Sequence, residues 1–141
     1  MLQRASHAVY ELGYHFVWIP KRRRALLRDR VARRLAELLR TLAEDYGWQL
    51  HEVSVQPDHV HVFLGAAPRF SPSQIIQVLK GTTARQLFLE FPELRAELPS
   101  GELWSEGYFV RGVGEKVTAH IVQRYIRHQD HEDRGKQLKL W

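Results

Sequence analysis

The chain has 141 residues, a length that fits one domain with one moderate hydrophobic core. Its hydrophobic fraction of 44% indicates a globular protein, and the absence of cysteine excludes a disulfide framework and a thiolate metal site. Lys and Arg number 21 against 16 Asp and Glu, and this net charge of +5 is compatible with binding a polyanion.

The first predicted elements are a long strand and a helix. Apolar and aromatic side chains alternate over residues 8–19, which predicts a strand that ends at Pro20. From about Ala25 the apolar residues recur with a helical period, and Gly47 is a natural stop for that helix.

Two further strands, over residues 48–56 and 59–65, are predicted after this helix. The Pro57-Asp58 turn between them is too short for a parallel crossover, so the two strands should pair antiparallel. Side chains alternate between the two faces of a strand. In the second strand this alternation places an apolar row on a face suited to packing under helices and sends three residues to the opposite face: His59, His61 and Phe63.

A second helix is predicted to open at Ser71. Ser71 can cap it, Pro72 suits the first helical position, and Gln74 can close a capping box. The helix should end near Phe91. Gly81 interrupts its middle at a cost of about 1 kcal/mol relative to alanine, so we expect a close backbone approach there.

The last predicted elements are a strand over residues 103–112 and a helix over residues 116–131. The resulting βαββαβα order predicts an α+β fold, a ferredoxin-like or RRM-like antiparallel sheet with helices on one face plus a C-terminal helix. We expect residues 1–131 to form one domain and residues 132–141 a flexible tail. No apolar run is long enough to cross a bilayer and no signal-peptide pattern is found, so we expect a cytoplasmic protein without membrane contact.

His59 and His61 are the first candidates for chemistry. Two imidazoles at this spacing can hold one divalent ion and leave coordination positions open for water or a substrate oxygen. The alternative is a pair of half-exposed strand histidines that make ordinary hydrogen bonds, and a His-x-His pattern alone does not decide between the two.

Tyr125 and Gln129 on the last predicted helix are the second candidates. Residues at i and i+4 are neighbours on a helix face, so the phenol and the amide would be presented together. The alternative places the tyrosine in the core or an interface and the glutamine in solvent. Two imidazoles, an amide oxygen and a phenol together are a plausible phosphoryl-transfer site, with a metal ion that polarises the phosphate and a tyrosine that attacks it.

Several stretches, in matching order from about His7 to Gln129, resemble one family. They are "YHFVWIPKRRRALL", "QPDHVHVFL", "SPSQIIQVLKGTTARQLF", "LWSEGYFVRGVG" and "YIRHQ". The family is that of the small single-tyrosine HUH transposases of bacterial and archaeal insertion sequences, the insertion-sequence 200-like transposases.

The resemblance implies roles for four residues. His59 and His61 match the histidines of the HUH metal motif, Gln129 matches the third metal ligand, and Tyr125 matches the nucleophile. It also implies Mg²⁺ or Mn²⁺ as cofactor, a homodimer, and association with the nucleoid when bound to DNA. The expected substrate is single-stranded DNA with hairpins near the element's ends, cleaved and rejoined through a 5′-phosphotyrosine link.

The expected DNA-binding surface has two parts. The basic run Lys21, Arg22, Arg23 and Arg24 is placed to hold phosphates. The helix segment with Lys80, Gly81, Thr82, Thr83 and Arg85 matches the part of the family that approaches DNA. Trp104 and Tyr108 could stack on unpaired bases, with core packing as the alternative for Trp104.

Two rival hypotheses remain for the function, and a few other residues are weighed as members of the site. A non-catalytic RRM-like nucleic-acid-binding domain would need none of the four site residues, and a domesticated or replication-type HUH endonuclease would keep the chemistry. We expect three histidines outside the motif to be structural or solvated, His15, His51 and His120. Asp58 is expected in a turn role, with the orientation of an imidazole as its alternative.

Overall fold

The computed structural model describes residues 3–5, 8–10, 12–112 and 123–129, with the backbone alone for the first two ranges. In chain order the elements are β1 (Gln3–Ala5), β2 (Ala8–Tyr10), β3 (Gly13–Trp18), a 3₁₀ helix (Lys21–Arg23), α1 (Asp29–Tyr46), β4 (Gln49–Gln56), β5 (His59–Gly65), α2 (Pro72–Glu90), α3 (Pro92–Ala96), β6 (Phe109–Gly112) and a helical segment over residues 123–129.

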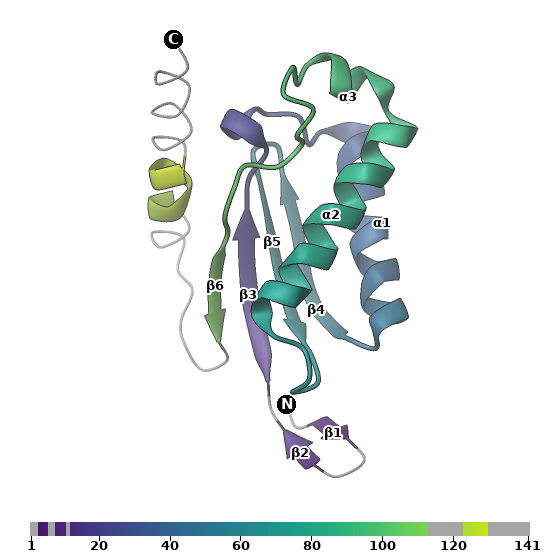
Figure 1. The fold of residues 1–141 in the computed structure, drawn as a ribbon, viewed down its shortest axis with the longest axis vertical. Helices are drawn as coiled ribbons and strands as arrows, with labels where there is room; N and C mark the ends of the chain where they lie inside the picture. The colour runs from purple at the N-terminus through teal and green to yellow at the C-terminus, as the bar shows by residue number, and fades with distance from the viewer. Residues whose placement is uncertain (1–2, 6–7, 11, 113–122, 130–141) are drawn as a thin grey trace.

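A four-stranded sheet with the order β4-β5-β3-β6 forms the centre of the fold (Figure 1). Every neighbouring pair in it is antiparallel. The first strand of the βαββαβ unit therefore lies between the third and the fourth, which is the ferredoxin-like arrangement that the sequence predicts. The short β4–β5 connection produces the antiparallel hairpin that was expected.

Helices α1 and α2 cover one face of this sheet (Figure 1). The core between the two layers contains Phe16 and Trp18 of β3, the apolar row Val60, Val62 and Leu64 of β5, and the buried stripes of both helices. The ends of the helices follow the predicted signals. Gly47 ends α1 in the left-handed conformation with φ 70°, and Ser71 and Gln74 form a complete capping box at the start of α2.

The segment over residues 123–129 lies on the opposite side of the sheet, next to β6 (Figure 1). Its Ile126 is buried, as is Val17 of β3, whose side chain alternates away from the helix layer. The rest of the predicted last helix and the predicted tail over residues 132–141 lie outside the described residues.

Two predicted strand boundaries are wrong. The expected strand over residues 8–19 is divided into β2 and β3, because the partners of β3 end at Gly65 and Gly112 and the chain before it pairs with β1 instead. The expected strand over residues 103–112 begins only at Phe109. The preceding stretch makes an isolated bridge between Trp104 and Pro20 instead of joining the sheet.

Two helical details also differ from the prediction. Helix α1 begins at Asp29 instead of about Ala25, because the stretch before it extends towards the hairpin turn and Leu27 N–H donates to the Pro57 carbonyl at 3.1 Å. The short helix α3 was not expected.

No helix in the ranges that the structure describes has the length and apolar character of a membrane span.

Candidate functional site: the histidine face of the sheet

His59 and His61 lie on the sheet face that α1 and α2 leave uncovered. Their strand neighbours Val60 and Val62 are fully buried in the core under the helices, so the alternation of β5 turns both imidazoles the other way. Both rings are half-buried. The predicted placement of the pair on one face, opposite the apolar row, is what the structure shows.

The ring of His59 is fixed by the residue before it. Nδ1 of His59 lies 2.9 Å from Oδ1 of Asp58, and since a carboxylate can only accept, Nδ1 is the donor. The second carboxylate oxygen of Asp58 lies 3.4 Å from Nε of Arg23. In the neutral imidazole this leaves the lone pair of Nε2 for a ligand, the arrangement that orients many metal-binding histidines. Asp58 therefore has both the turn role and the orienting role that were weighed for it.

The ring of His61 has different partners. Its Nε2 lies 3.1 Å from Nδ1 of His15, and its Nδ1 lies 4.0 Å from Oε1 of Glu52. His15 in turn stacks on Phe63, with ring centroids 4.2 Å apart and planes 6° apart. The sequence led us to expect a structural or solvated His15, and its contacts with His61 and Phe63 are those of a structural side chain.

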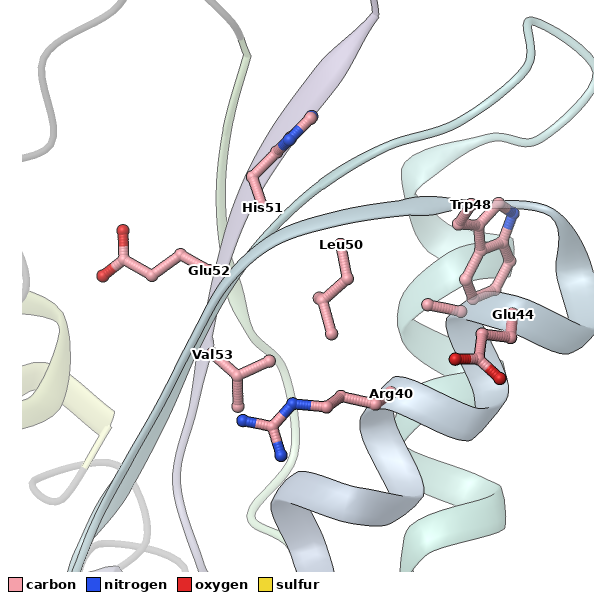
Figure 2. Close-up of a pocket in the computed structure, with 8 residues that line it drawn as sticks. Arg40, Glu44, Trp48, Leu50, His51, Glu52 and Val53 are labelled. Atoms are coloured by element: carbon pink, nitrogen blue, oxygen red, sulfur yellow. The ribbon is translucent and has the colours of Figure 1, made fainter.

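A β-bulge explains how Glu52 reaches this face. The register of β4 against β5 shifts between Leu50 and Glu52, so that Glu52 lies opposite Phe63 and His51 is the extra residue. Figure 2 shows Leu50 and Val53 directed towards Arg40 of α1, while Glu52 points to the other side of the strand. A strict alternation over residues 48–56 does not reveal this shift, so the contribution of Glu52 could not be predicted.

Burial lowers the pKa of His61 below its usual value. The carboxylate of Glu52 opposes this shift, and the neighbouring His15 and His59 add to it. Burial lowers the pKa of His15 as well, again against the effect of Glu52. Both rings are therefore neutral near pH 7, and the neutral imidazole is the form that can coordinate a metal.

Tyr125 reaches the same face from the helical segment. Its ring lies 6.1 Å from the ring of Phe109, which pairs with Val17 of β3, and Val17 in turn pairs with His61 of β5. Tyr125 therefore lies over the cross-strand row that contains His61, separated from it by β3. The hydroxyl oxygen of Tyr125 is buried in this arrangement.

Gln129 lies one helical turn further, near the row of His59. Its Nε2 donates to Oγ of Ser105 at 3.1 Å, and the backbone N–H of Ser105 donates to the Ile19 carbonyl at 2.9 Å. Ile19 follows Trp18, which pairs with Val60, the neighbour of His59. The side chain of Gln129 is 5% exposed, and its Oε1 lies 3.6 Å from the place where a Cβ at Gly107 would be.

The four predicted residues thus share one face, in two neighbouring rows, with β3 between the histidines and the helical segment. Among the described residues, no three His, Cys, Asp or Glu side chains gather in an arrangement that could hold a metal ion. A divalent ion held by His59 and His61 would need an oxygen ligand of another type. The Oε1 of Gln129 fits this requirement, because the hydrogen bond to Ser105 uses the amide nitrogen.

The basic run before α1 is linked to acidic partners. Nζ of Lys21 lies 3.0 Å from Glu102, Arg23 pairs with Asp58, and a guanidinium nitrogen of Arg24 lies 3.7 Å from Glu97. Arg22 and Arg23 both have left-handed φ angles, 57° and 52°, which non-glycine residues adopt at a cost. These contacts fix the shape of the run and offset part of its charge.

Lys80 and Thr83 of the predicted DNA-binding helix segment are engaged with the protein itself. Nζ of Lys80 donates to the carbonyls of Ser105 and Gly107 at 2.8 and 2.9 Å. Thr83 is fully buried and donates to the Leu79 carbonyl. Trp104 is also buried in the core, which agrees with the packing alternative that was weighed for it.

The other residues of this segment remain accessible. Gly81 and Thr82 are half-buried and Arg85 is exposed. A Cβ at Gly81 would meet only the end of the Arg85 side chain, at 3.3 Å, so the helix surface there is open within the described chain. The close backbone approach expected at Gly81 is not made by the described part of the chain itself.

Two grooves lie elsewhere on the molecule. A groove of about 390 Å³ lies between α1 and β4 and is lined by residues that include Arg40, Trp48 and His51 (Figure 2). A larger and more apolar groove of about 590 Å³ lies beside α2 and is lined by residues that include Arg85, Phe88 and Leu103. Neither is lined by the four site residues.

Comparisons with known proteins match the chain to one family. The family described as "Transposase IS200 like" matches residues 8–129. The chain is 38% identical over 121 residues to the ISDra2 transposase TnpA of Deinococcus radiodurans, with 86% of each chain covered. It is 35% identical over 136 residues to the transposase for insertion sequence element IS200 of Salmonella typhimurium, with 96% of this chain and 88% of that one covered.

Solved structures show the same likeness. A crystal structure of a Deinococcus radiodurans R1 protein assigned as a transposase matches with a TM-score of 0.79 at 36% identity, covering 90% of this chain and 97% of that one. A REP-associated tyrosine transposase bound to a REP hairpin matches with a TM-score of 0.55 at 13% identity, covering 91% of this chain and 68% of that one. The second likeness concerns the fold alone.

Proposed function

The chain belongs to the IS200-like transposase family, and on that premise we propose that it cleaves and rejoins single-stranded DNA through Tyr125 with the help of a divalent metal ion. The ligands would be His59, His61 and Gln129, and the ion Mg²⁺ or Mn²⁺. Two imidazole ligands suit Mn²⁺, while Mg²⁺ favours oxygen ligands, so both ions belong in the tests.

One observation carries this proposal. Two imidazoles, an amide oxygen and a phenol occupy one face of the sheet, and they come from two elements that are more than 60 positions apart in the sequence. A core or a simple binding surface has no use for this set. Phosphoryl transfer does, because it needs a nucleophile and a centre that offsets the developing negative charge.

The chemistry assigns a task to each side chain. The phenol oxygen of Tyr125 attacks the phosphorus, a new O–P bond forms, and the bond from phosphorus to the 3′ oxygen breaks, so that the 3′ oxygen leaves and takes up a proton. Asp58 holds His59 in place, and Ser105 holds Gln129. A bound metal ion would polarise the phosphate and favour the ionised phenol. The phosphotyrosine ester conserves the bond energy, so rejoining needs no ATP.

The proposed partners follow from the same premise. We propose single-stranded DNA with hairpins near the ends of an insertion sequence as the substrate, in line with the REP hairpin bound by the structural neighbour. A homodimer, and association with the nucleoid when DNA is bound, belong to the same proposal.

The proposal is tested by a covalent-adduct assay. The protein is incubated with single-stranded oligonucleotides that cover the element's ends, with Mg²⁺, Mn²⁺ or EDTA, and is then denatured and separated by size. We expect a protein–DNA band that needs metal and is lost in Tyr125→Phe but kept in the control Tyr108→Phe, whose ring packs against the core. Tight hairpin binding without an adduct would favour the non-catalytic binding domain instead.

A further inference from the structure

One side chain outside the proposed metal set contacts a member of it directly. Nδ1 of His15 on β3 lies 3.1 Å from Nε2 of His61 on β5. His15 belongs to the strand between the two halves of the site, so its position depends on the sheet and not on the helical segment.

The contacts of His61 run along the strand away from His59. Its Nε2 faces His15 and its Nδ1 lies nearest to Glu52, and both of these residues pair with Phe63 in the sheet register. His59 lies in the other direction, opposite Gln56. A metal ion shared by His59 and His61 requires a His61 nitrogen turned towards His59, so the observed ring orientation is not the one that binds such an ion.

The ring of His15 is itself held in place. It stacks almost parallel on Phe63, with centroids 4.2 Å apart, and it also stacks with His61 at 5.3 Å. His51 lies against the same Phe63 ring, with centroids 4.8 Å apart. Since the His15 ring is packed, its hydrogen bond to His61 costs little additional ordering.

Resting on the proposed function, we propose that His15 is a positioning residue that competes with the metal ion for Nε2 of His61. In the metal-free protein the His15 hydrogen bond holds the His61 ring back from His59. Metal binding breaks that hydrogen bond and turns the ring towards His59. The site is then assembled only when an ion is bound, at the cost of one hydrogen bond between neutral rings.

The test compares the Mn²⁺ affinity of full-length variants in the absence of DNA, from the electron paramagnetic resonance signal of free Mn²⁺. His15→Phe keeps a ring to stack on Phe63 but cannot hydrogen-bond, so we expect it to bind Mn²⁺ about three- to tenfold more tightly than the wild type. His15→Asn places an amide near the former Nδ1 and can restore the hydrogen bond, so we expect an affinity close to that of the wild type.

His51→Phe is the matched control. It removes a histidine that touches the same Phe63 ring but no proposed ligand, so it should leave Mn²⁺ affinity unchanged. A His15→Phe protein that binds Mn²⁺ equally or more weakly would overturn the proposal, because His15 would then be neutral or would support the ligand. Absence of Mn²⁺ binding in both the wild type and His15→Phe would overturn it as well.

A second measurement does not depend on the folding of a variant. In ¹⁵N spectra of the wild-type imidazoles, Mg²⁺ should shift the Nδ1 signal of His15, although His15 is not a ligand, and an unchanged signal would contradict the competition. The covalent-adduct assay separates the two proposals. A metal-dependent adduct through Tyr125, combined with an unaltered Mn²⁺ affinity in His15→Phe, would leave the proposed function standing and remove only the role of His15.

Discussion

At the scale of single residues, the orientation of His59 depends on Asp58. The carboxylate binds Nδ1 of the imidazole on one side and the guanidinium of Arg23 on the other. Partners of this kind set the direction of a ligand's lone pair without touching the metal, and their loss commonly weakens metal binding 10- to 100-fold, by order of magnitude. The strained conformation of Arg23 is compatible with this task.

We therefore expect Asp58→Asn to weaken Mn²⁺ binding by about tenfold, since the amide is a poorer partner for the imidazole N–H and has no charge for Arg23. Calorimetric titration with Mn²⁺ measures the affinity of the variant and of the wild type. Glu97→Gln is the control, because it removes a carboxylate that pairs with the same basic run, at Arg24. Equal affinities for the two variants would show that Asp58 serves the turn alone.

The lowered pKa values of His61 and His15 give a prediction for the metal-free chain. Burial keeps both rings neutral in the fold, whereas in the unfolded chain they gain protons below a pKa of about 6.5. The unfolded state then binds more protons, so stability falls as the pH drops through about 6.5. The lowered pKa of the Glu90 carboxyl acts only in a more acidic range.

Thermal unfolding in EDTA at pH 7.5 and pH 5.5 checks this expectation. The wild type should melt at a lower temperature at pH 5.5, and His61→Gln should show a smaller difference between the two pH values. An identical pH dependence in the two proteins would mean that the buried imidazole does not contribute.

At the scale of elements, most of the fold followed from local patterns. The hairpin of β4 and β5, the capping box of α2 and the glycine stop of α1 each have a signal within a few residues, and each was confirmed. The predictions for the strand before β3 and for the start of β6 were wrong, because the limits of these strands depend on where their partner strands end. Pairing partners are a property of the whole sheet, which periodicity within one strand does not contain.

The same distinction applies to the site. The placement of His59 and His61 on one face was predictable from alternation alone. The contact of His15 with His61 was not predictable, because it depends on the register between β3 and β5. The position of Glu52 was not predictable either, because it depends on a β-bulge in β4. The helix segment around Lys80 was expected to face DNA, yet Lys80 binds two carbonyls of the chain between α3 and β6.

This contact makes a prediction for Lys80→Met. The variant keeps an unbranched apolar stem but loses the charged donor to the Ser105 and Gly107 carbonyls, so we expect a loss of about 1–3 kcal/mol in the free energy of unfolding. Because Ser105 also holds Gln129, adduct formation should fall as well. Urea denaturation measures the stability.

Arg85→Gln is the comparison on the same helix, since Arg85 is exposed and, within the described chain, donates to Oγ1 of Thr82 at the long distance of 3.4 Å. Its stability should remain within about 0.5 kcal/mol of the wild type. A Lys80→Met protein that is as stable as Arg85→Gln, but binds DNA less tightly, would assign Lys80 to the DNA surface instead.

At the scale of the whole molecule, the distribution of charge determines which basic side chains are available to contact DNA phosphates. The net charge of +5 is modest, and several basic side chains of the run before α1 are paired with acidic ones. The exposed Arg85 on the open part of α2 is therefore a better candidate for phosphate contact than the paired side chains of that basic run. Each phosphate contact adds to the dependence of affinity on salt.

We expect Arg85→Gln to weaken single-stranded DNA binding and to reduce the slope of log affinity against log salt by about 0.7. The control is Arg34→Gln, because Arg34 bonds to Glu90 at 2.7 Å and to Glu37 at 3.2 Å. Fluorescence anisotropy at several salt concentrations gives both slopes. If Arg34→Gln reduced the slope as much as Arg85→Gln, the open surface of α2 would not be the phosphate-binding surface.

The central claim is that Tyr125 carries the cleaved DNA. Its most direct test is to digest the purified protein–DNA adduct with protease and nuclease and to identify the modified peptide by mass spectrometry. We predict a nucleotide attached through its 5′ phosphate to Tyr125, formed with Mg²⁺ or Mn²⁺ and absent in EDTA. An adduct on Tyr14, Tyr46 or Tyr108, or a link through a 3′ phosphate, would contradict the assignment of the nucleophile and the chemistry derived from it.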